Sequence, residues 1–185
     1  MPRVCKNLAA AAFILFFAGP FAQPSAVLAA NGGNKMFMLA QAEYAQGSFA
    51  GQEYVNKGLE AGSRAIFAQT EFAKNRALTE QMMWFGKALP YLRAGYLQHP
   101  NEFPYIARLA LAYNILGNPA DELAVLADAS HRLPNNAEIV FMYGQSLART
   151  GDLLRAIQQA ERLDRLGSSK ASTLRTFIRM RVQQP

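Results

Sequence analysis

An internal repeat with a period of about 34 residues is the feature that most constrains this chain. When the sequence is shifted by one period, apolar residues fall on apolar ones and small residues fall on small ones. A fixed period of this length indicates an array of similar two-helix units, each of which buries its apolar face only against its neighbours. The aligned pairs are Ile106 and Val140, Leu109 and Tyr143, Ala110 and Gly144, Tyr113 and Leu147, Gly117 and Gly151, and Leu123 and Ile157.

Each unit is predicted to contain two helices. The first helix of the best-defined unit has an apolar stripe at helical spacing, at Ile106, Leu109, Ala110 and Tyr113. Gly117 is expected to end this helix, because glycine adopts the left-handed conformation at little cost. Pro119 is then expected to open the second helix, since proline is tolerated in a first helical turn. The small residue at positions 110 and 144 would let paired helices approach closely.

These residues resemble the signature of the tetratricopeptide-repeat (TPR) family. Two departures stand out: Glu122 occupies the position of an alanine early in the second helix, and Ser168 that of the closing proline. The matching residues of the unit 103–136 are Leu109, Ala110, Tyr113, Gly117, Leu126, Ala129 and Pro134. Those of the unit 137–170 are Tyr143, Gly144, Leu147, Gly151, Ala156, Ala160 and Leu163.

The resemblance implies an all-α fold, a right-handed α-solenoid of helix-turn-helix repeats. Upstream of the two full units, residues 69–102 are predicted to form a partial TPR-like repeat, and residues 31–68 a degenerate helical hairpin. Residues 171–185 are predicted to form a capping helix and tail that cover the last unit, as solenoids require. About seven to nine helices and no sheet are expected.

Residues 1–30 have the order of a secretory signal peptide. A basic start with Arg3 and Lys6 precedes the uncharged apolar run 8–17, which is followed by proline, glycine and small residues. Cleavage is predicted after Ala29 or Ala30; retention as an anchor is the alternative. Cys5 lies ahead of the apolar run, so it is not a lipid-attachment cysteine, and the rest of the chain has no cysteine. A periplasmic location is therefore predicted.

The sequence offers no constellation typical of catalysis, and we predict that the protein is not an enzyme. His99 and His131 stand just before Pro100 and Pro134. They are interpreted either as a pair of metal ligands or general bases one repeat apart, or as two cations at helix C-termini. The second interpretation is favoured because no cysteine or clustered carboxylate accompanies them. The glycines form no phosphate-binding loop. No metal or cofactor is predicted.

An apolar cluster at residues 82–85 has two interpretations. Met82, Met83, Trp84 and Phe85 could form a sticky partner site, since methionine and aromatic residues are enriched in interfaces. The core interpretation is favoured because Phe85 is in register with core positions of the second helix. Gly51, Gly58 and Gly62 are interpreted as close-packing sites or turns.

The TPR resemblance also implies a concave groove lined by the first helices of successive units. Its predicted lining is mostly apolar, which suits a helix or an extended peptide of a partner protein. The family's carboxylate-clamp positions are filled by Ala107 and Leu111, so that binding mode is not expected. The alternative is that some of these residues pack under the C-terminal helix. The predicted partner-binding residues are Ala107, Leu111, Asn114, Ile115, Phe141, Gln145 and Arg149.

Charge is concentrated at the C-terminus. Residues 31–148 carry a net charge of −1, whereas residues 149–185 carry +5. A solvated outer face is the preferred interpretation, ahead of anionic lipid or an acidic partner, and nucleic acid is not expected.

The function predicted is a non-catalytic interaction module, an adaptor or assembly factor. The alternatives are an accessory subunit of an envelope enzyme or secretion complex, and a peripheral protein that contacts anionic lipid through its basic C-terminus.

Overall fold

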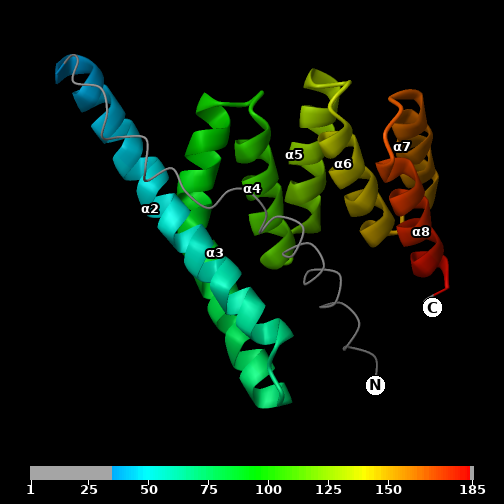
Figure 1. Cartoon of the computed structure of the whole chain (residues 1–185), viewed down its shortest axis with the longest axis horizontal. Helices are drawn as coiled ribbons and strands as arrows, with labels where there is room; N and C mark the ends of the chain where they lie inside the picture. Colours follow the sequence, from blue (N-terminus) through cyan, green and yellow to red (C-terminus); the bar gives the residue numbers. More distant parts are fainter. Residues whose placement is uncertain (1–34, 184–185) are drawn as a thin grey trace. The chain divides into compact units, whose positions relative to one another are not determined.

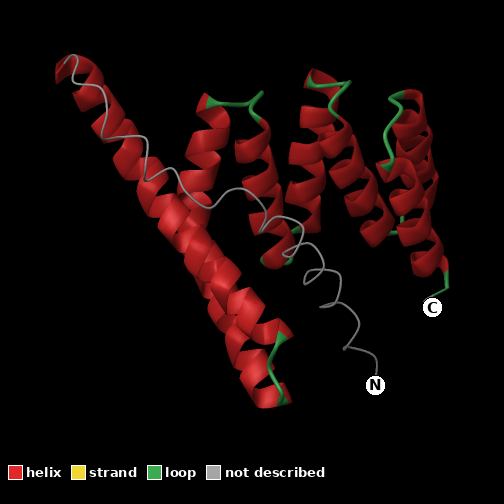
Figure 2. Ribbon diagram, in the orientation of Figure 1, coloured by secondary structure: helices red, strands yellow, loops and turns green. Residues whose placement is uncertain are grey.

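The fold was analysed in a computed structural model that describes residues 35–183, with side chains from residue 51 onward. These residues form seven helices and no strand (Figure 2), so the all-α prediction is confirmed for them. The predicted signal peptide and Cys5 lie outside the described residues. No described helix is long and apolar enough to cross a bilayer. The helices are α2 (Lys35–Ile66), α3 (Glu71–Gln98), α4 (Phe103–Ile115), α5 (Pro119–Arg132), α6 (Ala137–Thr150), α7 (Leu153–Arg165) and α8 (Lys170–Val182).

The chain divides into two compact units, one ending at Tyr91 and one beginning at Leu92, so that α3 contributes to both. In the second unit each helix from α4 to α8 packs on the next, and α8 also packs on α6 (Figure 1). The helix starts recur at the predicted interval: Ala137 begins α6 one period after Phe103 begins α4, and Leu153 begins α7 one period after Pro119 begins α5.

Glycines end three of these helices, and at Gly117 and its repeat partner Gly151 this confirms the prediction from the sequence. Gly117 and Gly151 have φ values of 73° and 90°, in the left-handed region. The amide after each glycine donates back into the helix, from Asn118 to the Tyr113 carbonyl and from Asp152 to the Leu147 carbonyl, both at 2.9 Å. These bonds satisfy carbonyls that have no partner inside a helix. Gly167, with φ 67°, ends α7 similarly.

The core of the second unit depends on a close approach at Gly144. A Cβ atom placed at Gly144 of α6 would collide with the Leu174 side chain of α8 and lie 3.1 Å from Cβ of Gln159 on α7. Leu174, Leu147 and Leu163 are fully buried in the same cluster. The predicted role of position 144 as a close-packing site is therefore confirmed, and α8 provides part of the cover over the last unit.

The N-terminal half has fewer helices than the sequence predicts. A helical hairpin was expected within residues 31–68 and a helix pair within 69–102, but each region contains a single long helix, α2 and α3. The α2 helix runs through Gly47, Gly51 and Gly58 without a break. At Gly51 an added Cβ would lie 2.6 Å from Cβ of Tyr91, and at Gly58 it would lie 2.7 Å from the Phe85 ring. Gly51 and Gly58 are contact points between α2 and α3, not helix ends.

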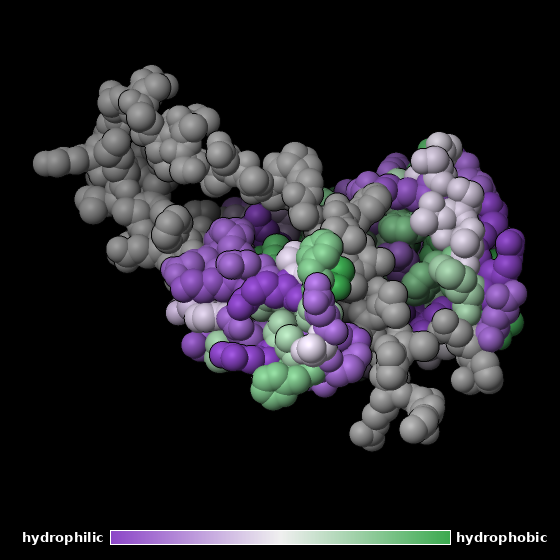
Figure 3. All heavy atoms as spheres, turned by 60° about the horizontal axis from the view of Figure 1, so that its bottom comes forward, coloured by the Kyte–Doolittle hydropathy of each residue, from purple (hydrophilic) through white to green (hydrophobic). Residues whose placement is uncertain are grey.

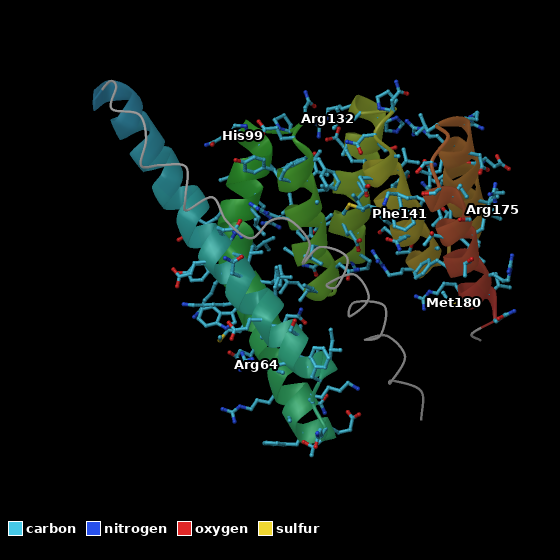
Figure 4. All side chains as sticks on the ribbon, viewed as in Figure 1. Arg64, His99, Arg132, Phe141, Arg175 and Met180 are labelled. Carbon is cyan, nitrogen blue, oxygen red and sulfur yellow. The ribbon has the colours of Figure 1, made fainter. Side chains whose placement is uncertain are left out.

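Three arginines, here called the arginine anchors, tie helices of the second unit to segments roughly one repeat earlier. Arg132 of α5 donates to the Pro100 carbonyl and to Oδ1 of Asn101, the latter at 2.7 Å. The guanidinium of Arg162 in α7 donates to the Pro134 carbonyl at 2.6 Å, and that of Arg181 in α8 to the Arg149 carbonyl at 3.3 Å. The acceptors lie at or just beyond helix C-termini, where a cation also complements the helix dipole. Figure 4 labels Arg132 at the C-terminal end of α5.

The Arg132 anchor also organises a charged cluster. The Tyr96 hydroxyl donates to Oδ2 of Asp128 at 2.6 Å, and Arg132 donates to the same oxygen at 2.8 Å. The hydrogen bond from Tyr96, followed by that from Arg132, holds the pKa of Asp128 below its ordinary value of 3.8. Burial, together with the hydrogen bond to Asp128, raises the pKa of Tyr96.

The lowered pKa of Asp128 predicts an acid-dependent contribution to stability. A carboxylate whose pKa is lower in the folded than in the unfolded protein stabilises the fold at every pH above the unfolded pKa, here 3.8. This contribution is lost as the pH falls through the pKa of the folded state. The difference in free energy of unfolding between wild type and Asp128→Asn should therefore be largest near pH 6 and shrink below about pH 4. Urea unfolding at pH 6, 4 and 3 measures it, with Glu161→Gln as a control for loss of an exposed carboxylate. A difference that stays constant down to pH 3 would contradict the assignment.

A pair of glycine substitutions tests the helix packing. Gly144→Ala should lower the free energy of unfolding by about 1–3 kcal/mol, because the new methyl group overpacks the contact with Leu174. Gly86→Ala should raise it by about 0.5–1 kcal/mol, since Gly86 lies inside α3 with open space around its Cα. Denaturant unfolding monitored by circular dichroism measures both values. Equal effects of the two substitutions would show that Gly144 is not a close contact.

Candidate partner-binding site

The predicted partner-binding residues lie on α4 and α6, but three of them are buried. Ala107, Leu111 and Phe141 expose only 3%, 4% and 8% of their surfaces. Phe141 belongs to the core cluster that includes Ala171 and Leu174 of α8, and the Lys170 ammonium lies 5.4 Å from its ring centre. The alternative that some of these residues pack under the C-terminal helix therefore holds for Phe141.

Asn114 and Arg149, two other predicted residues, are joined through Glu122. Nδ2 of Asn114 donates to Oε2 of Glu122 at 3.0 Å, and Nη2 of Arg149 donates to Oε1 of the same carboxylate. The Glu122 side chain is only 3% exposed and that of Arg149 is 15% exposed. This buried polar cluster connects the end of α4, the first turn of α5 and the last turn of α6.

Glu122 is the residue of this site that the sequence analysis did not assign. It appeared only as a departure from the family pattern, because the equivalent position of the next repeat is Ala156, which is fully buried. The structure gives the departure a reason: a small residue would leave the partly buried guanidinium of Arg149 without its carboxylate. The signal available in the sequence was the pairing of an acidic residue at a small position with an arginine 27 residues later.

Gln145 lies between Phe141 and Arg149 on α6, one helical turn from each. It is partly buried, and its Oε1 atom is buried with no hydrogen-bond partner in the described part of the chain. An unpaired buried acceptor of this kind is costly, so a donor that reached it would be favoured. Ile115, at the end of α4, is also partly buried. Of the seven predicted residues, Asn114, Ile115, Gln145 and Arg149 therefore keep some exposed surface, whereas the three apolar residues named above are buried.

Most of the cations in the basic C-terminal segment have partners within the protein. Nη1 of Arg175 donates to Oδ1 of Asp164 at 3.1 Å, and this pairing lowers the pKa of Asp164. Lys170 lies 3.0 Å from Oε1 of Glu138, and Arg155 pairs with Asp152 at 2.5 Å. Six of the eight cations of residues 149–185 therefore have partners within the protein, and all of these except Arg155 link different helices or a helix and a turn. The cations with such partners are Arg149, Arg155, Arg162, Lys170, Arg175 and Arg181.

The two histidines occupy helix ends, as the favoured interpretation expected. His99 follows the last residue of α3, with its ring 4.6 Å from that of Tyr105 and its Nδ1 atom 2.7 Å from Oε1 of Glu102 (Figure 4). His131 is in the last turn of α5. The described residues contain no group of three or more metal-ligating side chains.

The apolar cluster at residues 82–85 divides between core and surface. Phe85 is fully buried, as the core interpretation expected, whereas Met82 and Met83 expose about half of their surfaces. Trp84 stacks on Tyr54 with ring centres 5.9 Å apart, and the ammonium groups of Lys57 and Lys87 lie 4.8 and 4.5 Å from its ring centre. The indole is thus occupied by contacts between α2 and α3.

Comparison with known proteins gives no match to a protein-family model, to a curated protein or to a solved structure.

The buried Glu122–Arg149 pair predicts a large stability effect. Glu122→Gln should lower the free energy of unfolding by about 2–4 kcal/mol, because it leaves Arg149 partly buried without a counter-charge. Asp164→Asn, which breaks an ion pair whose side chains are both 47% exposed, should cost less than about 1 kcal/mol. Urea unfolding at neutral pH measures both. Similar losses for the two substitutions would contradict a structural role for the buried pair. The double variant Glu122→Ala, Arg149→Met should be more stable than Glu122→Ala alone, because it removes the cation together with its carboxylate.

Proposed function

We propose that this protein is a non-catalytic protein–protein interaction module, with α4 to α8 forming a TPR-like right-handed solenoid. The proposal rests on one observation above all: the helix starts and the left-handed glycines recur with the period of the sequence repeat, in helices that pack consecutively. Arrays of helical pairs present their first helices side by side, and such a surface suits an extended peptide or a helix. Together with the predicted signal peptide, this favours an adaptor or assembly factor in the periplasm.

The chemistry of the α4 and α6 surface suggests how a partner would be recognised. Asn114 and Arg149 are held in place by Glu122, so their side chains are pre-organised and lose little freedom on binding. The free acceptor of Gln145 suits a backbone amide of an extended peptide once the side chain turns outward. Ile115 supplies an apolar contact beside them. A peptide with an apolar side chain flanked by free backbone donors fits this set.

Site-specific crosslinking tests the proposal. A photo-reactive side chain introduced at Ile115 or Gln145 should capture one stoichiometric protein partner in a periplasmic extract. The matched control is Gln158, an exposed residue of α7, which should capture none. Gln145→Leu should weaken the captured complex about tenfold, since it removes the acceptor. Equal capture from position 158, or turnover of a substrate by the isolated, metal-stripped protein, would contradict the proposal.

A further inference from the structure

The turn between α2 and α3 carries two strongly exposed aromatic side chains. Phe67 exposes 76% of its surface and Phe72 exposes 79%. Leu97 and Leu154 are nearly as exposed, but the two rings lie only five residues apart in the chain, and burying each would be worth about 1.5–3 kcal/mol. Figure 3 turns this end of the helical hairpin toward the viewer, and hydrophobic atoms stand out there among hydrophilic ones.

The turn is ordered by its own hydrogen bonds. Oγ1 of Thr70 accepts from the Ala73 amide at 3.1 Å, as an N-cap of α3. The Phe67 amide donates to the Ser63 carbonyl at 3.3 Å, which continues the last turn of α2. Phe67 and Phe72 are therefore held at the same end of the hairpin, one just after α2 and the other in the first turn of α3.

Cations accompany the two rings. Within residues 64–76, Arg64, Lys74 and Arg76 stand against Glu71, a net charge of +2, and two further carboxylates, Glu60 and Glu80, lie within electrostatic reach of Arg64. Arg64 donates to Glu80 at 2.8 Å and Lys74 to Glu71 at 3.3 Å, both in solvent-exposed pairs that give way readily to other anions. Residues 64–76 are called the hairpin tip.

We propose that the hairpin tip docks on an anionic lipid surface by inserting Phe67 and Phe72 between headgroups. Two rings at the end of a helical hairpin can both enter a planar interface, and the neighbouring cations then face the anionic headgroups. Exposed phenylalanine beside cations is the side-chain combination that peripheral membrane contacts use. This surface belongs to the first unit of the chain and does not include the partner-binding residues on α4 and α6, so either proposal stands if the other fails.

Vesicle sedimentation tests the proposal with matched variants. The purified protein should bind vesicles containing 30 mol% phosphatidylglycerol. The double variant Phe67→Ser, Phe72→Ser should bind the same vesicles at least about tenfold more weakly. Leu97→Ser, Leu154→Ser removes two apolar side chains that are 76% and 71% exposed elsewhere, and should bind within about twofold of wild type. Arg76→Gln should weaken binding several-fold and reduce its salt dependence. Circular dichroism checks that each variant retains its helices.

A fluorescence experiment locates the contact. Trp84 is the single tryptophan, so Phe67→Trp in a Trp84→Phe background places the only indole at the tip. Its emission should shift to the blue and be quenched by brominated lipids, whereas Leu97→Trp in the same background should show neither change. The proposal is overturned if the emission at position 67 does not change or if the double serine variant binds vesicles as well as wild type. It is also overturned if the wild-type protein is a dimer and the double serine variant is a monomer, because the two rings would then form a contact between copies of the chain.

Discussion

The second unit depends on arginines that satisfy helix C-termini across the repeat. Helices α4 to α7 are 13 or 14 residues long, a length at which an isolated helix is marginal in water. Each ends in carbonyls without intrahelical partners. Arg132 and Arg162 donate to the carbonyls of Pro100 and Pro134 in the turns after α3 and α5, and Arg181 donates to the Arg149 carbonyl in the last turn of α6, each from 28 to 32 residues further along the chain. These hydrogen bonds join segments that are 28 to 32 residues apart in the chain. They therefore help short helices, each marginal alone, to form one stack in which successive helix pairs contact each other.

The features that the sequence predicted well are those determined within a few residues. Gly117 and Gly151 end α4 and α6 because a left-handed residue is needed there, and glycine supplies it whatever lies nearby. Pro119 opens α5 for an equally local reason. Gly144 was also predictable, because its alignment with Ala110 shows a position where only a small residue is used. The bounds of helices α4 to α7 follow from such signals.

The features that were missed depend on contacts between distant residues. The sequence predicts a helical hairpin within residues 31–68, yet α2 passes through Gly47 and Gly51 without a break, and at Gly51 the small residue admits Tyr91 of α3. Glu122 departs from the repeat pattern, and the reason is Arg149, which lies 27 residues away in the chain but contacts the Glu122 carboxylate in the folded protein. The burial of Ala107 and Leu111 likewise depends on packing that a stripe of apolar positions does not specify. A pattern can place a residue on a face of a helix, but only the tertiary structure says whether that face is open.

The same reasoning changes what the charge distribution means. The basic C-terminal segment suggested an anionic ligand, but Arg162, Arg175 and Arg181 are engaged with a carbonyl or a carboxylate of this protein. Because these contacts account for the three cations within the protein, the net charge of the segment does not by itself indicate a ligand. Polar atoms that are buried without a hydrogen-bond partner, and apolar side chains that are exposed to solvent, are better indicators of a binding surface. Gln145 is one of four described side chains with a buried polar atom that has no hydrogen-bond partner, with Gln81, Ser146 and Gln159, and it is the one among the predicted partner-binding residues. Phe67 and Phe72 have apolar surface without cover. The proposed partner site rests on the first of these features, and the proposed lipid contact rests on the second together with the cations beside it.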